Sequence, residues 1–478
     1  MAHKAVRRRM PNSFICFCSL IGSLWINWNL IWPVFMPRVN FVFPKWCQNL
    51  QLETASLVWT KQANGSVIST IGASNPQKTA IALLGARTVR EVAFGFISIT
   101  LPFYWQSKGL SIFSIGVLYS AALIGSALIT LLLGRYIDVI GRKRILIVSS
   151  LLWAVVTPFL AFTQDIYLLC LIMVFGSVSP TGKEIGIYQG VEQAMLAKLF
   201  AGHNRTKIYA WFNLVGYGAV ALGALLAALV GIGSVGSGQK NTFIWVAIAY
   251  AFAGVIQLVI YFLVDDVVEQ KHEKPIDEKS GYRPQKSVRT LVYQLSALFA
   301  LDSFAAGLVV QSLIVYWFRV NFHTDLTQLG LIFFGTNMLS ALSSLAAAKV
   351  ASKIGLLNTM VFTHLPSNIL LILVPFMPNA TLAVAMLLAR HMLSQMDVPT
   401  RAAYSMAMVS PDDRGYLAAW TNGARSFGTG VTPILAGLML SVSLSGIPFV
   451  AAGGLKVIYD ISLYFRFKRV PIDFANES

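Results

Sequence analysis

The chain has 478 residues, of which 56% are hydrophobic and 12% charged, and its formal net charge is +17. A soluble globular chain carries about twice this fraction of charged residues, so the composition excludes an ordinary soluble domain. The basic balance does not indicate nucleic-acid binding, because Lys and Arg collect in alternate short loops and at the ends of apolar runs, as the positive-inside rule describes.

Residues 1–80 form an extension to which we assign no role. Within it, residues 13–36 are apolar enough to cross a bilayer, but the basic start MAHKAVRRR would then lie on the outer side, against the positive-inside rule. The same stretch lacks the small-residue cleavage site of a signal peptide. An interfacial or inserted anchor and a stretch upstream of the true start therefore both stay open.

From Ala80 onward, apolar segments long enough to cross a hydrocarbon core of about 30 Å follow one another. They predict an all-α polytopic membrane protein with twelve transmembrane helices, over residues 81–106, 112–133, 145–163, 166–190, 207–231, 242–264, 290–318, 326–348, 357–377, 380–404, 415–440 and 446–465. The predicted organisation is a six-helix bundle over 81–264, a polar central loop over 265–289, a second six-helix bundle over 290–470 and a tail over 471–478.

The loops set the orientation of these spans. Those after the second, fourth, sixth, eighth and tenth spans carry most of the Lys and Arg, whereas the intervening loops carry few. The positive-inside rule therefore places the even-numbered loops, the central loop and the C-terminal tail in the cytoplasm. We expect a multi-pass protein of the plasma membrane or cell inner membrane, functional as a monomer.

The two halves of the chain share an internal sequence repeat. RTKIYAWFN after the fourth span matches RGYLAAWTN after the tenth, and GRYIDVIGRK after the second matches AKVASKIGLL after the eighth, with Gly141 facing Gly355. The offsets are about 209 and 214 residues, so one half is a degenerate copy of the other.

The loop GRYIDVIGRKR over residues 134–144 resembles the signature loop of the major facilitator superfamily. With the twelve spans and the repeat, the resemblance covers about residues 80–470. It implies two six-helix bundles that rock about a central cavity near the bilayer midplane to give alternating access. It also implies a cytoplasmic latch between the halves. The latch residues would be Gly134, Asp138, Gly141, Arg142 and Lys143, opposite Arg414. Ser352 stands where a second Asp would correspond, so a symmetric latch is not expected.

Charged residues inside the spans are candidates for a substrate or proton pathway, because a charge at the bilayer centre costs at least about 2.5–3.5 kcal/mol unless it is paired or wet. The candidates are Glu91, Lys183, Glu184, Asp302, Arg390, His391, Asp397 and Arg425. In the resembled superfamily the first, fourth, seventh and tenth helices surround the cavity and the eleventh also contributes to it, and nearly all these charges fall on these helices.

Several of these charges have plainer alternatives. Asp302 could form a structural ion pair with Arg390 or Arg425 instead of handling substrate or protons. His391 could be a packed polar residue or a proton relay. Arg87 and Arg90 could extend their side chains to the cytoplasmic face.

In the fourth span, Gly182, Gly186 and Gly190 recur every fourth residue, which predicts a small-residue face on a continuous helix. Pro180 can bend this span or free a carbonyl group. Lys183 and Glu184 are adjacent, so they point about 100° apart on a helix and cannot neutralise each other. We expect at least one of them to find a partner across the cavity, with Arg90 or Glu91 on the first span as candidates.

No P-loop or catalytic motif occurs, and the four cysteines have no metal-ligand spacing, so we expect neither an enzyme, a metal nor a cofactor. The sequence predicts a secondary active transporter of a small solute with protons as the coupling ion. A facilitator without proton coupling and a non-transporting sensor on the same fold stay open. The mixed charges suit an organic anion, a zwitterion or a neutral solute bordered by ion pairs, and the direction of transport is open.

Overall fold

The computed structural model describes residues 76–134, 136–184, 186–200, 202–233, 239–265, 284–442 and 446–469. Most of the extension over 1–80, including residues 13–36, lies outside the described residues. So do most of the central loop over 265–289 and the tail over 471–478. The predictions made for these segments stay predictions.

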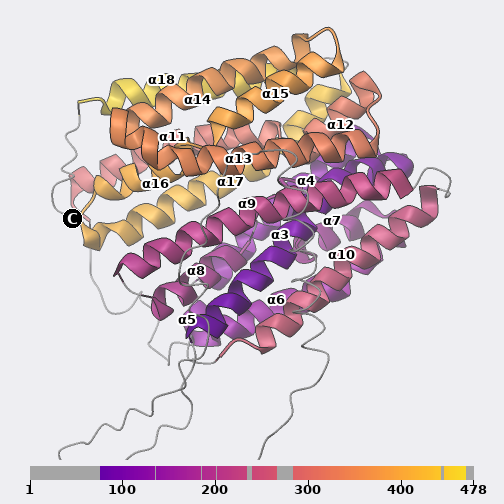
Figure 1. Cartoon of the computed structure of the whole chain (residues 1–478), viewed down its shortest axis with the longest axis horizontal. Helices are drawn as coiled ribbons and strands as arrows, with labels where there is room; N and C mark the ends of the chain where they lie inside the picture. The colour runs from indigo at the N-terminus through magenta and orange to yellow at the C-terminus, as the bar shows by residue number, and fades with distance from the viewer. Residues whose placement is uncertain are drawn as a thin grey trace, which may run out of the picture. The chain divides into compact units, whose positions relative to one another are not determined.

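Helices of the first half gather on one side in Figure 1, coloured from indigo through magenta to rose. They are α3 (Pro76–Ser107), α4 (Ile112–Gly134), α5 (Ile137–Ile140), α6 (Arg142–Val156) with the 3-10 helix η1 (Thr157–Ala161), α7 (Ile166–Phe175), α8 (Tyr188–Leu199), α9 (Gly202–Gly233) and α10 (Gln239–Phe262).

Helices of the second half gather on the other side, coloured from pink through orange to yellow. They are α11 (Lys286–Leu308), α12 (Gln311–Phe322), α13 (Leu326–Ile354), α14 (Leu356–Leu373) with η4 (Val374–Phe376), α15 (Ala380–Ser394), α16 (Asp397–Ala407), η5 (Pro411–Asp413), α17 (Arg414–Ser441) and α18 (Ile447–Phe467).

The expected all-helical polytopic fold is confirmed. Eight stretches of helix in the described part of the chain are long and apolar enough to cross a bilayer. The remaining expected spans are the fourth and tenth, which are interrupted, and α3 and α17, whose apolar sequence carries buried charges, glycines and small polar residues.

The internal repeat is visible in the backbone. Gly141 separates α5 from α6 and has φ 104°, and Gly355 separates α13 from α14 and has φ 84°. Positive φ favours glycine, because a Cβ atom would crowd the backbone there. The two glycines that the sequence alignment pairs therefore make the same turn in the two halves.

The halves meet where α4 packs on α17 and where α9 packs on α13. A Cβ on Gly116 would lie 2.4 Å from the carbonyl oxygen of Pro433, and one on Gly330 would lie 2.5 Å from the backbone nitrogen of Ala228. Glycine thus lets these helix backbones approach closely, as is common between membrane helices.

These close approaches lie toward one end of the bundle. We call it the far end, where α4 begins at Ile112 and α17 stops at Ser441 (Figure 1). The opposite end, where α10 stops at Phe262 and α11 begins at Lys286, is called the loop end. The close glycine contacts therefore bring the two halves together toward the far end.

Candidate functional site

The fourth span is not a continuous helix. α7 ends at Phe175 and α8 begins at Tyr188, and the chain between them has left-handed backbone at Gly182 (φ 67°) and Gly186 (φ 82°). The expectation of one helix over 166–190 with a small-residue face is therefore wrong. Gly182 and Gly186 do not pack a helix; they let the chain leave the right-handed conformation at low cost, whereas Gly190 lies within α8.

This interrupted segment is docked against both halves. A Cβ on Gly182 would lie 2.7 Å from Nε2 of Gln311 and 2.8 Å from Oγ of Ser98. The carbonyl oxygen of Pro180 accepts a hydrogen bond of 3.0 Å from the backbone nitrogen of Ser312. The carbonyl group of Pro180 thus joins the fourth span to α12, and Pro180 lies in irregular backbone instead of bending a continuous helix.

The seventh and tenth spans are interrupted as well. α11 ends at Leu308 and α12 begins at Gln311, while α15 ends at Ser394 and α16 begins at Asp397. Irregular backbone at membrane depth is tolerated only where it is buried in protein or lines a wet cavity. Three interruptions on the fourth, seventh and tenth spans therefore indicate a common polar centre.

A charged network in the first half is built on Arg90, whose side chain on α3 is fully buried. Its guanidinium donates to Glu184 at 2.7 and 2.9 Å and to Glu192 on α8 at 2.7 and 3.0 Å. The hydroxyl of Tyr261 on α10 accepts from Arg90 at 3.0 Å and donates to Glu192 at 2.7 Å. The partner expected for Glu184 on the first span is confirmed, whereas the extension of Arg90 to the cytoplasmic face is wrong.

A second, looser pair lies one helical turn before Arg90. Nη2 of Arg87 lies 3.2 Å from Oε1 of Glu91, and Nη1 lies 3.6 Å from Oε2 of Glu184. Oε2 of Glu91 is buried and accepts no hydrogen bond from any donor in the described part of the chain. Three carboxylates therefore face two guanidinium groups in this network, which leaves one formal negative charge in excess.

A corresponding network in the second half is built on Asp302 of α11. Its Oδ2 accepts from Arg401 of α16 at 2.9 Å, and its Oδ1 accepts from the ammonium of Lys456 on α18. Arg401 also lies 3.2 Å from Asp397, one turn earlier on its own helix. All four side chains are buried.

The partners expected for Asp302 are wrong. Arg425 donates from Nε to Oγ of Ser303 at 3.3 Å, and Nε of Arg390 is buried without a hydrogen-bond partner among the described residues. Arg401 lies within the predicted tenth span and Lys456 within the twelfth. Lys456 was missed because α18 is not among the helices that the resembled superfamily places around its cavity, and Arg401 was missed although it lies on the tenth span, near the predicted end at residue 404.

His364 and Asn368 of α14 extend the network in the second half. Nδ1 of His364 lies 2.8 Å from Oδ1 of Asp460, and Nδ2 of Asn368 donates to Oδ2 of Asp460 at 2.9 Å. Nε2 of His364 lies 4.0 Å from Oδ1 of Asp302. The available sequence signal was a pair of polar residues four positions apart within an otherwise apolar span, as in His364 and Asn368 or Lys456 and Asp460.

The two networks occupy equivalent helices with the charges exchanged. In the first half a cation on the first span, Arg90, is held by a carboxylate on the fourth, Glu192. In the second half a carboxylate on the seventh span, Asp302, is held by a cation on the tenth, Arg401. The last span of each half completes the network. Each half is thus tied together internally by its own buried charges.

Lys183 lies between the halves. Its ammonium is 5.5 Å from the ring centroid of Tyr217 on α9, and the hydroxyl of Tyr217 donates to Gln395 at 3.2 Å. Gln395 lies in the interruption of the tenth span, so this hydrogen bond joins the halves. The positive charge of Arg390, at the end of α15, acts electrostatically on Lys183. His391 hydrogen-bonds through Nδ1 to the carbonyl oxygen of Leu387 at 2.7 Å.

The signature loop is described in part. Gly134 ends α4, Lys143 lies in the first turn of α6, and Arg142 donates from Nη1 to the carbonyl oxygen of Ala194 at 3.4 Å. Arg414 begins α17. The side chain of Asp138 lies outside the described residues, so the latch between Asp138 and Arg414 stays a prediction.

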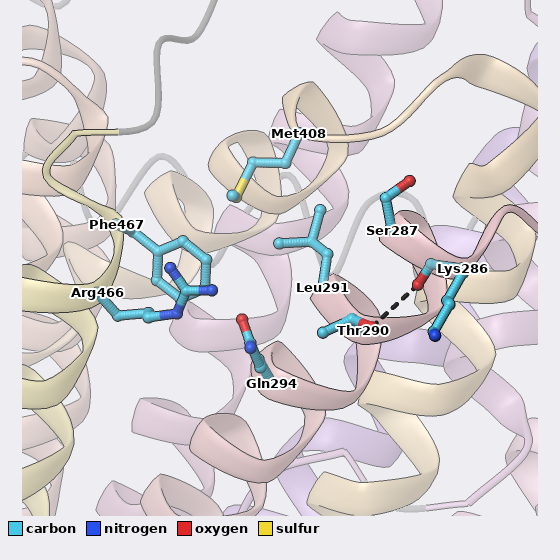
Figure 2. Close-up of a pocket in the computed structure, with 8 residues that line it drawn as sticks. All are labelled: Lys286, Ser287, Thr290, Leu291, Gln294, Met408, Arg466 and Phe467. Atoms are coloured by element: carbon cyan, nitrogen blue, oxygen red, sulfur yellow. Dashed lines mark hydrogen bonds between the residues drawn. The ribbon is translucent and has the colours of Figure 1, made fainter.

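A pocket opens at the loop end of the second half, with a volume of about 470 Å³. Figure 2 shows Leu291 between the side chains of Phe467 and Arg466 on one side and those of Ser287 and Lys286 on the other. Lys286 precedes Asp302 by about 24 Å along α11, at 1.5 Å per residue. No residue expected at the transport site lines this pocket.

The comparisons agree with this architecture. The family model of the Major Facilitator Superfamily matches residues 83–394. An uncharacterized membrane protein of Saccharomyces cerevisiae, YJR124C, is 24% identical over 410 residues, which cover 79% of this chain and 92% of that protein.

Among solved structures, the nucleoside transporter NupG, in a mutant form, is similar with TM-score 0.65 and 13% identity over 81% of this chain and 100% of that chain. A bacterial homologue of the human lysosomal transporter Spinster, in an inward-facing and occupied conformation, gives TM-score 0.65 and 17% identity over 84% of this chain and 98% of that chain. At these identities the likeness shows the fold alone. The family match covers more than half of the sequence, and the chain belongs to the Major Facilitator Superfamily of membrane transporters.

Proposed function

We propose that this transporter is a proton-coupled secondary transporter of a small solute, working by alternating access, with Glu91 and Glu184 as its proton site. The observation that carries the proposal is a buried network in which Glu91 and Glu184 both lie beside Arg87, at 3.2 and 3.6 Å. Oε2 of Glu91 is buried without a hydrogen-bond donor among the described residues, so a proton on this carboxyl group removes a negative charge that is not fully compensated. The network around them also holds one carboxylate more than it holds guanidinium groups.

The arrangement of the halves supports alternating access. Each half is held together by its own network of buried charges. The halves are joined to each other by single hydrogen bonds, such as those from Tyr217 to Gln395 and from Ser312 to the carbonyl oxygen of Ser98. Rocking would exchange these few contacts and leave both networks intact.

We further propose that the loop end faces the cytoplasm of the plasma membrane, because the basic loops lie there. The far end, where the close glycine contacts lie, then faces outward, and we infer that the conformation described here is closed to the outside. Labelling of a single cysteine introduced at Lys353, which is exposed on α13, tests the orientation in intact cells. If a membrane-impermeant reagent added outside the cells labels this cysteine, the orientation is the opposite of the one proposed.

The transport proposal is tested with the full chain as a monomer in proteoliposomes, against a panel of radiolabelled solutes, with and without an imposed pH gradient. Solutes are first selected by thermal stabilisation. We expect the pH gradient to drive accumulation of a solute. Glu91→Gln should abolish that accumulation while leaving exchange of solute across the membrane, and Asp412→Asn, at an exposed position, should resemble the wild type.

Each alternative predicts a different result. Flux that ignores the pH gradient in the wild type would make the protein a facilitator. If the protein is folded but transports no solute of the panel, the non-transporting sensor is the alternative that is supported. Full gradient-driven accumulation in Glu91→Gln would exclude the proposed proton site while leaving the transport proposal in place.

A further inference from the structure

Four cations inside the spans have a carboxylate partner. Arg87, Arg90, Arg401 and Lys456 all form ion pairs. Lys183, Arg390 and Arg425 do not: among the described residues, none of the three lies within ion-pair distance of a carboxylate. These three cations fall on the fourth, tenth and eleventh spans, around the polar centre.

The remaining contacts of these cations are weak. Lys183 lies over the ring of Tyr217, Arg425 donates one hydrogen bond of 3.3 Å to Ser303, and Nε of Arg390 is buried without a partner. Unpaired charge at membrane depth is costly and is kept where it serves a site. The structure therefore holds three cations that form no direct ion pair in the described part of the chain.

We propose that the substrate is a small organic anion, whose carboxylate or phosphate group binds between Lys183 and Arg390 with Arg425 beside them. This inference rests on the proposed transport function and names its substrate class. Ammonium and guanidinium groups donate charge-assisted hydrogen bonds to both kinds of oxyanion. The hydroxyl of Tyr217 and the amide of Gln395, which join the same two segments, are neutral groups at the same place.

The placement of the cations links binding to the conformational change. Lys183 belongs to the first half, and Arg390 and Arg425 belong to the second, and Lys183 and Arg390 repel each other. A bound anion removes that repulsion and attracts both halves, so it favours conformations in which the halves close around it. A ligand can shift the equilibrium only by such a difference in affinity between the two states.

The same placement links the anion to the proton. The negative charge of Glu91 also acts on Lys183. A proton on Glu91 removes this competing charge, and the field at Lys183 then favours an incoming anion. The anion and the proton should therefore move in the same direction, as in symport.

The test uses the purified full-length protein and matched probes that differ mainly in charge: succinate, succinamate and succinamide as one series, and glucose 6-phosphate with glucose as the other. Thermal stabilisation and binding isotherms are measured at two salt concentrations. We expect stabilisation by anionic members only, weakening as salt rises. The two series separate carboxylate from phosphate recognition.

Lys183→Gln and Arg390→Gln should each weaken anion binding about tenfold or more, since a hydrogen bond to a charged group is worth about 1.5–3 kcal/mol. Arg390→Lys keeps the charge and should recover part of the affinity. Lys353→Gln, at an exposed position, is the control. Because neutral variants relieve repulsion between cations, they should fold, and the melting temperature without probe checks this.

Three results would overturn the inference: stabilisation by the neutral members of a series, anion binding that is unchanged in Lys183→Gln and Arg390→Gln, or no stabilisation by any anionic probe. In each case gradient-driven flux of another solute in proteoliposomes would leave the transport proposal standing. The failure of the substrate class is thus separated from the failure of the transport function.

Discussion

Arg90 and Glu192 are both fully buried and lie 2.7 Å apart, although 102 residues separate them along the chain. The pair joins α3 to α8, and the hydroxyl of Tyr261 closes it from α10. A buried ion pair of this kind is kept only with satisfied hydrogen bonds, because neither charge retains water.

Glu192→Gln should therefore destabilise the protein strongly. The change leaves Arg90 with less negative charge inside the membrane, and breaking one partner of a buried pair typically costs about 3–5 kcal/mol. Thermal unfolding of the detergent-solubilised protein measures the effect, with Asp412→Asn at an exposed position as the control. Equal melting temperatures for the two variants would contradict the structural role of the pair.

A double-mutant cycle on Asp302 and Lys456 should give a coupling energy well above 1 kcal/mol. The two side chains are in direct contact and buried, and contacting residues in one network are coupled by about 0.5–3 kcal/mol. Asp302→Asn alone leaves Lys456 with a weaker partner, and Lys456→Met in the same chain should recover part of the loss. Additive effects of the two changes would show that the contact does not stabilise the second half.

Gly182→Ala should reduce both stability and transport, whereas Gly190→Ala should not. Gly182 has φ 67° and a Cβ there would collide with Gln311, while Gly190 lies in α8 with open space around its Cα. Left-handed backbone costs an L-residue about 1–2 kcal/mol. Melting temperature and initial flux check the pair. If the two alanine variants behave alike, the fourth span is helical through Gly182, as the sequence pattern first indicated.

Gly116→Leu should open the far end. The substitution places a side chain where the carbonyl oxygen of Pro433 lies 2.4 Å from the ideal Cβ position. In a background without native cysteines, a cysteine at Ser120, which is buried at the same interface, reports the opening. Its labelling by a water-soluble thiol reagent should rise by more than fivefold with Gly116→Leu, while a cysteine at the exposed Ser111 should label equally in both backgrounds. Unchanged labelling at Ser120 would show that this glycine does not seal the far end.

Much of the fold could be predicted because its signals are local. The length of the apolar segments predicts the spans, and the distribution of Lys and Arg predicts their orientation. A glycine at a turn indicates a backbone with positive φ, as Gly141 and Gly355 both show. The interruption of the fourth span could not be predicted in the same way. Three glycines at intervals of four fit a helical face as well as a turn, and only the docking of Pro180 and Gly182 against α12 decides between them.

The pairing of charges was decided by tertiary structure alone. The sequence identified Glu184 and Asp302 as charges within the spans, and it offered Arg90 as a partner for Glu184. For Asp302 it offered Arg390 and Arg425, whereas the structure pairs Asp302 with Arg401. A long cationic side chain can reach a carboxylate on any neighbouring helix, so its partner depends on the rotation and depth of both helices. Apolar length and charge distribution determine by themselves that this chain crosses a membrane many times; which buried charges pair follows only from how the helices pack.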